Sequence, residues 1–263
     1  MYELQYSKPS SVNDAVDEIK KSSDAKFIAG GMTMIPTLKA RLSSADLLVD
    51  LKGSNLSNIS VSSSEVVVGS MTRHCDVASS SDIKGSLPAL AKLAGGIGDH
   101  MVRSCGTIGG SLANNDPAAC YPSAVLALGA TVVTNERSIT ADDFFEGMFE
   151  TALNEDEIIT EIKFPIPEKA SYIKFPNPAS RYVMVGVFVA KFPNGVQVAV
   201  TGAGEDGVFR AKDIEAALSA NFDAASLDGV TMSEDGLIED LHASPAYRAH
   251  LILEMARRAV AAC

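Results

Sequence analysis

The sequence predicts a mixed α+β protein, and three features of its pattern support this fold class. The N-terminal third alternates helical and strand patterns, as α/β units do. Beyond Pro165-Ile166-Pro167, two apolar runs over 182–192 and 196–201 are joined by Pro193-Asn194-Gly195, which is typical of a hairpin. Two helical patterns, near 211–220 and 244–261, close the chain. We therefore expect a domain boundary at residues 165–167.

The N-terminal third predicts two strands and two helices in alternation. The first helix begins at Ser11-Val12-Asn13-Asp14, where Asp14 stands in the capping-box position. Its apolar face would consist of Val12, Ala15, Val16 and Ile19. Residues 26–29 and 46–51 predict the strands. The second helix begins between them at about Met32 or Thr33, because Pro36 is tolerated only within a first turn.

The middle of the chain combines regular elements with one unusual stretch. Strands are predicted over 65–69, 131–134 and 157–164, and a helix over 88–94. Residues 95–116 hold six glycines and little apolar periodicity, so we expect a long irregular segment there. Asp116-Pro117 follows as an N-cap and a first helical residue, and it predicts a helix that extends to about Leu128.

Charge and composition exclude several classes of protein. The net charge is −11 and the basic residues are scattered, so the surface would repel a phosphate backbone and no nucleic-acid binding is expected. The N-terminus lacks the layout of a signal peptide. The most apolar stretch, Tyr182 to Phe192, is too short to span a bilayer. These features predict a cytoplasmic protein without a membrane span.

The four cysteines predict neither a metal site nor an iron–sulfur cluster. They are Cys75, Cys105, Cys120 and Cys263. No CxxC pair occurs, and the spacings match neither a zinc site nor a cluster-binding run. We interpret these thiols as reduced and structural.

Two glycine-containing segments are candidates for an anion site. Ala29-Gly30-Gly31-Met32-Thr33 lies between a predicted strand and a helix start, where unsatisfied amides and a nearly side-chain-free backbone would admit a diphosphate. The second segment is Thr107 to Asp116, which is long, polar and rich in glycine. Taken alone, the first is more typical of a tight turn than of an anion site. The second is equally compatible with a loop whose Asn and Asp side chains satisfy its own backbone.

Together the two segments resemble the flavin motifs of a known family. The stretch from Ala29 to Leu51 looks like the first motif of the FAD-binding (medium) subunits of the xanthine dehydrogenase and aerobic carbon monoxide dehydrogenase family, the molybdenum hydroxylases. Gly106 to Pro117 resembles the second motif. The similarity extends to Ile97-Gly98-Asp99, Val102-Arg103, Thr151-Ala152-Leu153, Asp156 to Ile159 and the closing helix from Ser244 to Arg258, so it covers essentially the whole chain.

This resemblance implies a fold and a cofactor. The fold would be a PCMH-type FAD-binding domain over residues 1–165, with subdomains of about 1–55 and 56–165. A C-terminal flavoprotein domain with an antiparallel sheet and helices would follow over residues 166–263. The cofactor would be FAD, and the resemblance implies no catalytic residue for an organic substrate and no metal ligand.

The resemblance also assigns individual residues to the cofactor. Ala29 to Thr33 and Thr107 to Ser111 would surround the FAD diphosphate. Asp116 would bond the ribityl–phosphate region, and Ile159 would lie near the adenine. Lys174 would stand beside the flavin ring, and Tyr182 would cover it. The full set of implied contacts is Ile28, Ala29, Gly30, Gly31, Met32, Thr33, Met34, Ile35, Thr107, Ile108, Gly109, Gly110, Ser111, Asp116, Ile159, Lys174 and Tyr182.

Some of these positions have simpler interpretations or depart from the family pattern. From the sequence alone, Lys174 and Tyr182 are a surface lysine and a strand tyrosine. Met32 and Thr33 stand where many members of the family have histidine and serine, and Ser111 replaces a common asparagine. All three residues retain their backbone amide donors. The departures therefore change the expected side-chain contacts but not the expected cofactor.

Two further patterns resemble functional sites but have simpler interpretations. Gly202 to Gly207 matches G-x-G-x-x-G, but no helix opens within it and no second parallel strand follows. We therefore expect the end of a hairpin there. His74 has no nucleophile pattern near it, and we interpret it as structural or as a residue near the flavin edge.

The resemblance implies a role in electron transfer. In the family, a molybdopterin subunit hydroxylates the substrate and a small subunit with two [2Fe-2S] clusters conducts electrons. The flavin subunit then passes them to NAD, a quinone or oxygen. Because this chain has no cluster ligands, it would be the last electron carrier of the complex, the one that passes electrons to the external acceptor. Two alternatives remain open: a self-sufficient FAD-dependent oxidase of the same architecture, and a structural subunit that has lost its flavin.

Overall fold

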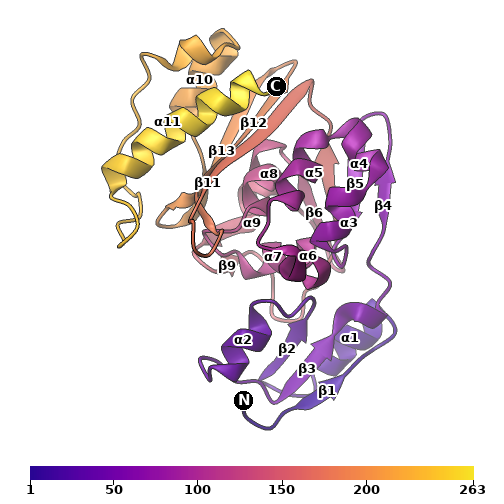
Figure 1. Ribbon diagram of the computed structural model, residues 1–263. Coiled ribbons are helices and arrows are strands. Elements are labelled where there is room, and N and C mark those ends of the chain that lie inside the picture. The colour runs from indigo at the N-terminus through magenta and orange to yellow at the C-terminus, as the bar shows by residue number, and fades with distance from the viewer.

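The computed structural model describes residues 1–263 and contains three main β-sheets, each with its own helices (Figure 1). The N-terminal part is a three-stranded parallel sheet in the order β1-β3-β2. Its elements are β1 (Gln5–Ser7), α1 (Val12–Ile19), β2 (Ala25–Ile28), α2 (Met34–Lys39) and β3 (Leu47–Asp50), followed by a short 3-10 turn over Leu51–Gly53. Ser11 caps α1, because its hydroxyl accepts a hydrogen bond from the Asp14 amide at 3.1 Å.

The middle part is a five-stranded antiparallel sheet covered by short helices. The sheet order is β4-β5-β10-β6-β7. Its strands are β4 (Ile59–Val61), β5 (Glu65–Gly69), β6 (Thr131–Thr134), β7 (Ser138–Thr140) and β10 (Ile159–Pro165). The helices are α3 (His74–Ser79), α4 (Ser81–Ser86), α5 (Pro88–Gly95), α6 (His100–Cys105), α7 (Ile108–Asn114), α8 (Tyr121–Ala127) and α9 (Ala141–Phe144). A small hairpin of β8 (Phe145–Gly147) and β9 (Glu150–Thr151) follows α9.

The C-terminal part is a four-stranded antiparallel sheet with both faces covered. The elements are β11 (Lys169–Pro176), β12 (Val183–Phe192), β13 (Gly195–Gly204), β14 (Gly207–Arg210), α10 (Lys212–Ala220), the 3-10 turn Ala224–Leu227 and α11 (Pro245–Ala261). Val187 and Val189 of β12 belong to the core under α10 and α11, whereas Phe188 and Ala190 belong to the core of the middle part. Because both faces are buried, residues 183–190 form an uninterrupted run without polar side chains.

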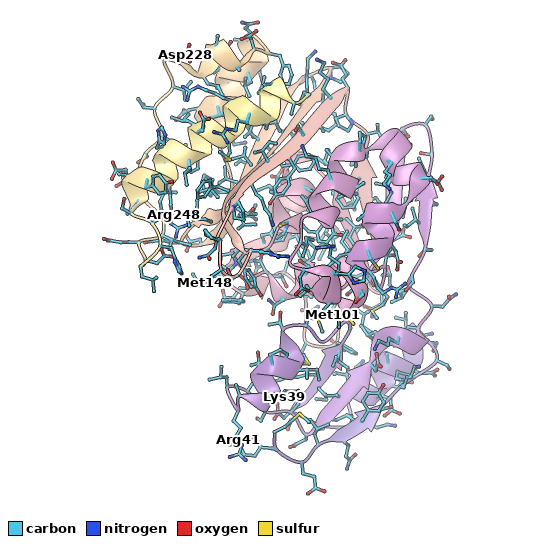
Figure 2. The ribbon with its side chains drawn as sticks, in the orientation of Figure 1. Lys39, Arg41, Met101, Met148, Asp228 and Arg248 are labelled. Atoms are coloured by element: carbon cyan, nitrogen blue, oxygen red, sulfur yellow. The ribbon has the colours of Figure 1, made fainter.

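Arg248 near the start of α11 fixes this helix to the sheet (Figure 2). Its guanidinium donates hydrogen bonds to the carbonyl oxygens of Met184 and Gly202, both at 2.8 Å, and to Asp240 Oδ2 at 2.7 Å. The amide of Gly202 in turn donates to the carbonyl of Pro117 at 2.7 Å. These bonds connect the C-terminal sheet to the segment that precedes α8.

Several sequence predictions are confirmed in detail. The strands predicted over 65–69 and 131–134 have those limits, and the 193–195 turn joins β12 to β13. Gly202 to Gly207 does end a hairpin, between β13 and β14. The mixed α+β class is also confirmed. Because one core of 32 buried residues includes residues on both sides of Pro165–Pro167, the division into domains there stays a prediction.

Two predictions about the stretch before α8 are wrong. Residues 95–116 are not irregular, because they contain α6 and α7. These helices are only six and seven residues long, and α6 buries none of its residues. Neither helix therefore shows a periodic pattern of apolar residues in the sequence. The next helix begins at Tyr121 and not at Asp116. Asp116 Oδ1 instead accepts a hydrogen bond from the Ala118 amide at 2.8 Å, which closes a turn.

Candidate functional site

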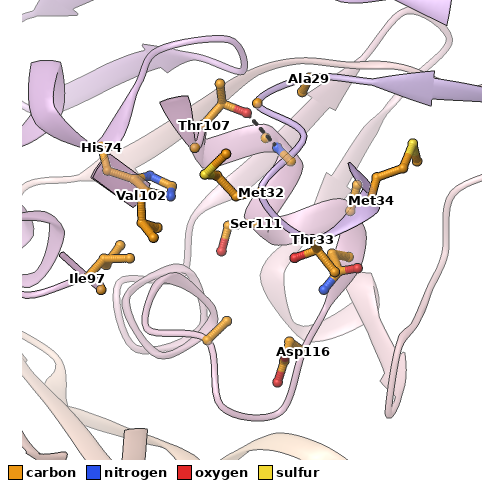
Figure 3. A pocket seen from close by; sticks show the side chains of 18 of the residues that line it. Ala29, Met32, Thr33, Met34, His74, Ile97, Val102, Thr107, Ser111 and Asp116 are labelled. Carbon is orange, nitrogen blue, oxygen red and sulfur yellow. Dashed lines mark hydrogen bonds between the residues drawn. The ribbon is translucent and has the colours of Figure 1, made fainter. Parts of the chain in front are cut away.

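A cleft of about 650 Å³ lies where the three parts of the protein meet. Its lining comes from the turn between β2 and α2, from residues 97–119, from residues 153–159, and from β11 and the loop before β12. Figure 3 shows side chains of the β2–α2 turn and of the 107–116 region gathered around this space. A volume of this size is in the range of sites for cofactors and drug-sized ligands.

The first glycine segment offers free backbone donors to the cleft. The amides of Gly30, Gly31, Met32 and Thr33 donate no hydrogen bond within the chain. Gly31 has φ +71°, a conformation that residues with a side chain rarely adopt. Four consecutive free amides before the first turn of a helix form a site for an anion such as a diphosphate.

The two glycine segments lie directly against each other. A Cβ atom on Gly30 would stand 2.3 Å from the Cys105 carbonyl oxygen and 2.7 Å from Gly106 Cα. A Cβ atom on Gly110 would stand 3.4 Å from Ala29 Cβ. The segments therefore meet backbone to backbone at the cleft.

The second segment is paired to the chain that precedes α3. The amide of Ile108 donates to Thr72 O at 3.1 Å, and that of Gly109 donates to Ser70 O at 2.8 Å. The His74 amide donates to Gly106 O at 2.9 Å. The Gly110 amide donates to Thr107 Oγ1 at 3.2 Å, the bond drawn in Figure 3. This segment brings its backbone close to the cleft but has few free donors.

The cleft includes nearly all of the residues that the sequence predicts for the cofactor. Of the seventeen, only Ile35 and Ile108 do not line it. Ile108 is fully buried in the core beneath α7, and Ile35 packs back toward Gly31. The remaining fifteen, from three separate parts of the fold, surround one space.

Lys174 and Tyr182 approach the cleft from β11 and the loop after it. The Lys174 ammonium donates to Gly96 O at 2.6 Å and to Arg181 O at 3.3 Å. Tyr182 is 54% exposed, and burial of its remaining surface raises the pKa of its phenol, with a smaller contribution from the Asp116 carboxylate. Lys174 is therefore fixed in place, and Tyr182 and Asp116 are close enough to interact.

The structure adds His74 to the cleft wall, at a position that the sequence interpretation left undecided. The imidazole is buried and packs against the Tyr121 ring at a tilt of 52°, with 5.4 Å between the ring centroids. Burial lowers the pKa of His74 to about 4, and the charge of Arg103 adds to this shift. The ring is therefore neutral at physiological pH. In the sequence, only the Arg73-His74 pair after a predicted strand indicated that His74 could belong to a site.

Glu157 supports the wall near Ile159. Its side chain is fully buried and accepts hydrogen bonds from Arg137 Nε at 3.0 Å, from Thr134 Oγ1 at 2.7 Å and from the Asn154 amide at 3.0 Å. These bonds, above all the one from Arg137, lower the pKa of Glu157 to about 2. The carboxylate is therefore ionised and holds residues 153–159 in place.

The loop before β12 contributes residues that sequence reasoning missed. Ala179, Ser180 and Arg181 line the cleft beside Tyr182. Asn177 shapes this loop, because its side-chain oxygen accepts a hydrogen bond from the Ala179 amide at 2.9 Å. Asn177-Pro178 is a turn-forming pair and was the signal that could have indicated the loop.

Comparison with known proteins identifies the family. Residues 2–167 match the family described as the FAD binding domain in molybdopterin dehydrogenase. The chain belongs to this family. The predicted cofactor, FAD, and the assignment to an oxidoreductase are thereby confirmed, and the free amides between β2 and α2 fit the diphosphate of such a cofactor.

Similar proteins include medium subunits of hydroxylases and dehydrogenases. The chain is 32% identical to the nicotine 6-hydroxylase medium subunit of Paenarthrobacter nicotinovorans, over 98% of this chain and 96% of that protein. It is 30% identical to the carbon monoxide dehydrogenase medium chain of Hydrogenophaga pseudoflava over the same shares. A solved structure of the Hydrogenophaga carbon monoxide dehydrogenase, lacking the Mo-pyranopterin moiety, matches with a TM-score of 0.88, 30% identity and coverage of 99% of this chain and 97% of that chain. This chain is therefore an FAD-binding subunit of the medium-chain type.

No helix combines the length and the apolar character needed to cross a membrane. No group of three or more His, Cys, Asp or Glu side chains is arranged to hold a metal ion.

Proposed function

We propose that this FAD-binding subunit is an electron relay of a molybdenum hydroxylase or dehydrogenase complex. It would receive electrons from the two [2Fe-2S] clusters of a small subunit, which a molybdopterin subunit reduces, and deliver them to NAD, a quinone or oxygen. FAD suits this position because it exchanges single electrons with a cluster and pairs of electrons with such acceptors.

The convergence of the two glycine segments on one cleft carries the proposal. The amides of Gly30 to Thr33 would bind the diphosphate, while the backbone of Gly109 and Gly110 would form the surface next to it. Asp116 would accept a hydrogen bond from the ribityl region, and Ile159 would pack near the adenine. Lys174 would place a positive charge beside the ring, and Tyr182 would shield one face from water.

The relatives support a role inside a complex. Those that match over nearly their whole length are named as medium subunits or medium chains, a designation that implies partners. The histidine of the cleft wall, His74, is buried and neutral, and we expect the chain's residues to bind and orient the cofactor without attacking an organic molecule.

Cofactor binding and electron relay are tested separately. The purified full chain, incubated with FAD, is expected to retain about one flavin per chain, and a Gly30→Val, Gly110→Val double variant to retain none. When the wild-type chain is mixed with the cluster and molybdopterin subunits, the organic substrate should reduce its flavin. When the cluster subunit is omitted, no reduction is expected.

Two outcomes would replace the proposal. Turnover of a small alcohol or amine by the chain alone would establish a self-sufficient flavin oxidase. A wild-type chain that retains no FAD, in a complex whose activity survives the double glycine substitution, would establish a structural subunit.

A further inference from the structure

Lys174 is a cation in the cleft whose three donor positions are all occupied by uncharged groups. Its ammonium donates to Gly96 O at 2.6 Å and to Arg181 O at 3.3 Å, and its third contact is Cys120 Sγ at 3.7 Å. None of the protein's salt bridges includes this lysine. The charge is therefore held in place without being neutralised by a carboxylate.

Cys120 is the side chain that completes this arrangement. It is 5% exposed, lines the cleft and stands at the N-cap position of α8. Burial raises the pKa of its thiol, although the nearby ammonium acts in the opposite direction. The sulfur is therefore a neutral, weak acceptor, and of the three contacts it is the one most easily exchanged for a stronger acceptor on a ligand.

We propose that Cys120 is a positioning residue for the flavin: its buried thiol directs the Lys174 ammonium into the cleft, leaves its charge without a carboxylate partner, and thereby raises the reduction potential of the bound cofactor. This inference rests on the proposed function. A positive charge beside a flavin ring stabilises its electron-rich reduced form. A carboxylate at position 120 would form an ion pair with Lys174 and cancel much of that field.

The fold allows substitutions of matched shape at this position. The Cys120 side chain makes no capping hydrogen bond to α8, so Cys120→Asp, Cys120→Asn and Cys120→Ser should each leave the start of this helix unchanged. The Asp and Asn variants have nearly the same shape and differ in charge. Any difference between these two variants therefore reports the electrostatic effect and not the packing.

The decisive measurement is the midpoint potential of FAD bound to each full-chain variant. Cys120→Asp is expected to lower it by at least about 30 mV, which is a tenfold change in the equilibrium of a two-electron couple. The midpoint potentials of Cys120→Asn and Cys120→Ser should differ from that of the wild type by less than about 30 mV. Lys174→Met should shift the potential in the same direction as Cys120→Asp. Equal potentials for the Asp and Asn variants would overturn the inference.

A second measurement uses the FAD-free protein. Cys120→Asp should melt at a higher temperature than Cys120→Asn because of its ion pair, and this difference should disappear in a Lys174→Met background. If the difference persists there, residue 120 does not act through Lys174. If the wild-type chain binds no FAD at all, the proposed function itself fails and the inference falls with it. If all variants bind FAD normally and their midpoint potentials equal that of the wild type, the inference about Cys120 is refuted but the proposed function is not.

Discussion

The two glycine segments of the cleft look alike in sequence but differ in what their backbones do. Between β2 and α2, four consecutive amides have no partner in the protein. Between α6 and α8, the amides of Ile108 and Gly109 are paired to the chain before α3. The first segment therefore supplies donors, whereas the second supplies a close, rigid surface. Glycine serves close packing in both segments, at Gly30 against Cys105 and Gly106 and at Gly109 against Ser70, but only the first segment also has free amides.

The largest expected effect is at the contact between the segments. Gly30→Ala places a Cβ atom 2.3 Å from the Cys105 carbonyl oxygen, a main-chain atom that cannot move without shifting α6. We expect the dissociation constant for FAD, measured by fluorescence titration, to rise at least about 100-fold, or about 3 kcal/mol. Wild-type affinity in this variant would show that the segments do not meet as described.

Gly109 should affect folding more than it affects binding. Gly109→Ala places a Cβ atom 2.5 Å from Ser70 Cβ and 2.8 Å from Ser70 O. We expect urea denaturation of the FAD-free chain to show a loss of about 1–3 kcal/mol. If stability is unchanged and only FAD affinity falls, the second segment binds the cofactor as the first one does, and the contrast between them disappears.

Gly110 provides the matched control within the same helix. Its added Cβ atom would meet only the Thr107 hydroxyl at 2.9 Å and Ala29 Cβ at 3.4 Å. Because alanine is the better helix former by about 1 kcal/mol, Gly110→Ala should melt within a few degrees of the wild type. We expect at most a tenfold loss of FAD affinity, and a larger loss would give Gly110 a direct role at the diphosphate.

A further expected effect concerns Glu157, in the part of the cleft wall that neither glycine segment forms. The pKa of Glu157 lies at about 2 in the folded chain, against an ordinary value of 4.5, so its contribution to stability is complete above pH 4.5 and is lost as the pH falls toward 2. Glu157→Gln should cost about 1–2 kcal/mol at pH 7, a modest value because Arg137 is 47% exposed. It should also flatten the acid limb of the stability curve, and an unchanged slope between pH 5 and pH 2 would refute the assignment.

The same contrast explains how much could be predicted from the sequence. The segment before α2 was recognisable because its properties are local: a strand, two glycines and a helix start. The helix α7 was not recognisable, because its first turn contains two glycines. Its hydrogen bonds to Ser70 and Thr72 also join residues that are far apart in the chain. Asp116-Pro117 misled for a related reason, since an aspartate that closes a turn and one that caps a helix have the same local pattern. His74 and Arg181 reach the cleft only through tertiary packing.

The sheet that carries Lys174 is covered on both faces, and this has a measurable consequence. Strand β12 pairs with β11 and β13 along its length, and its side chains enter two separate hydrophobic cores. A strand buried in this way can expose its amides only when both cores separate. The central amides of β12 should therefore exchange with deuterium only through global unfolding, and they should report the stability of the whole chain.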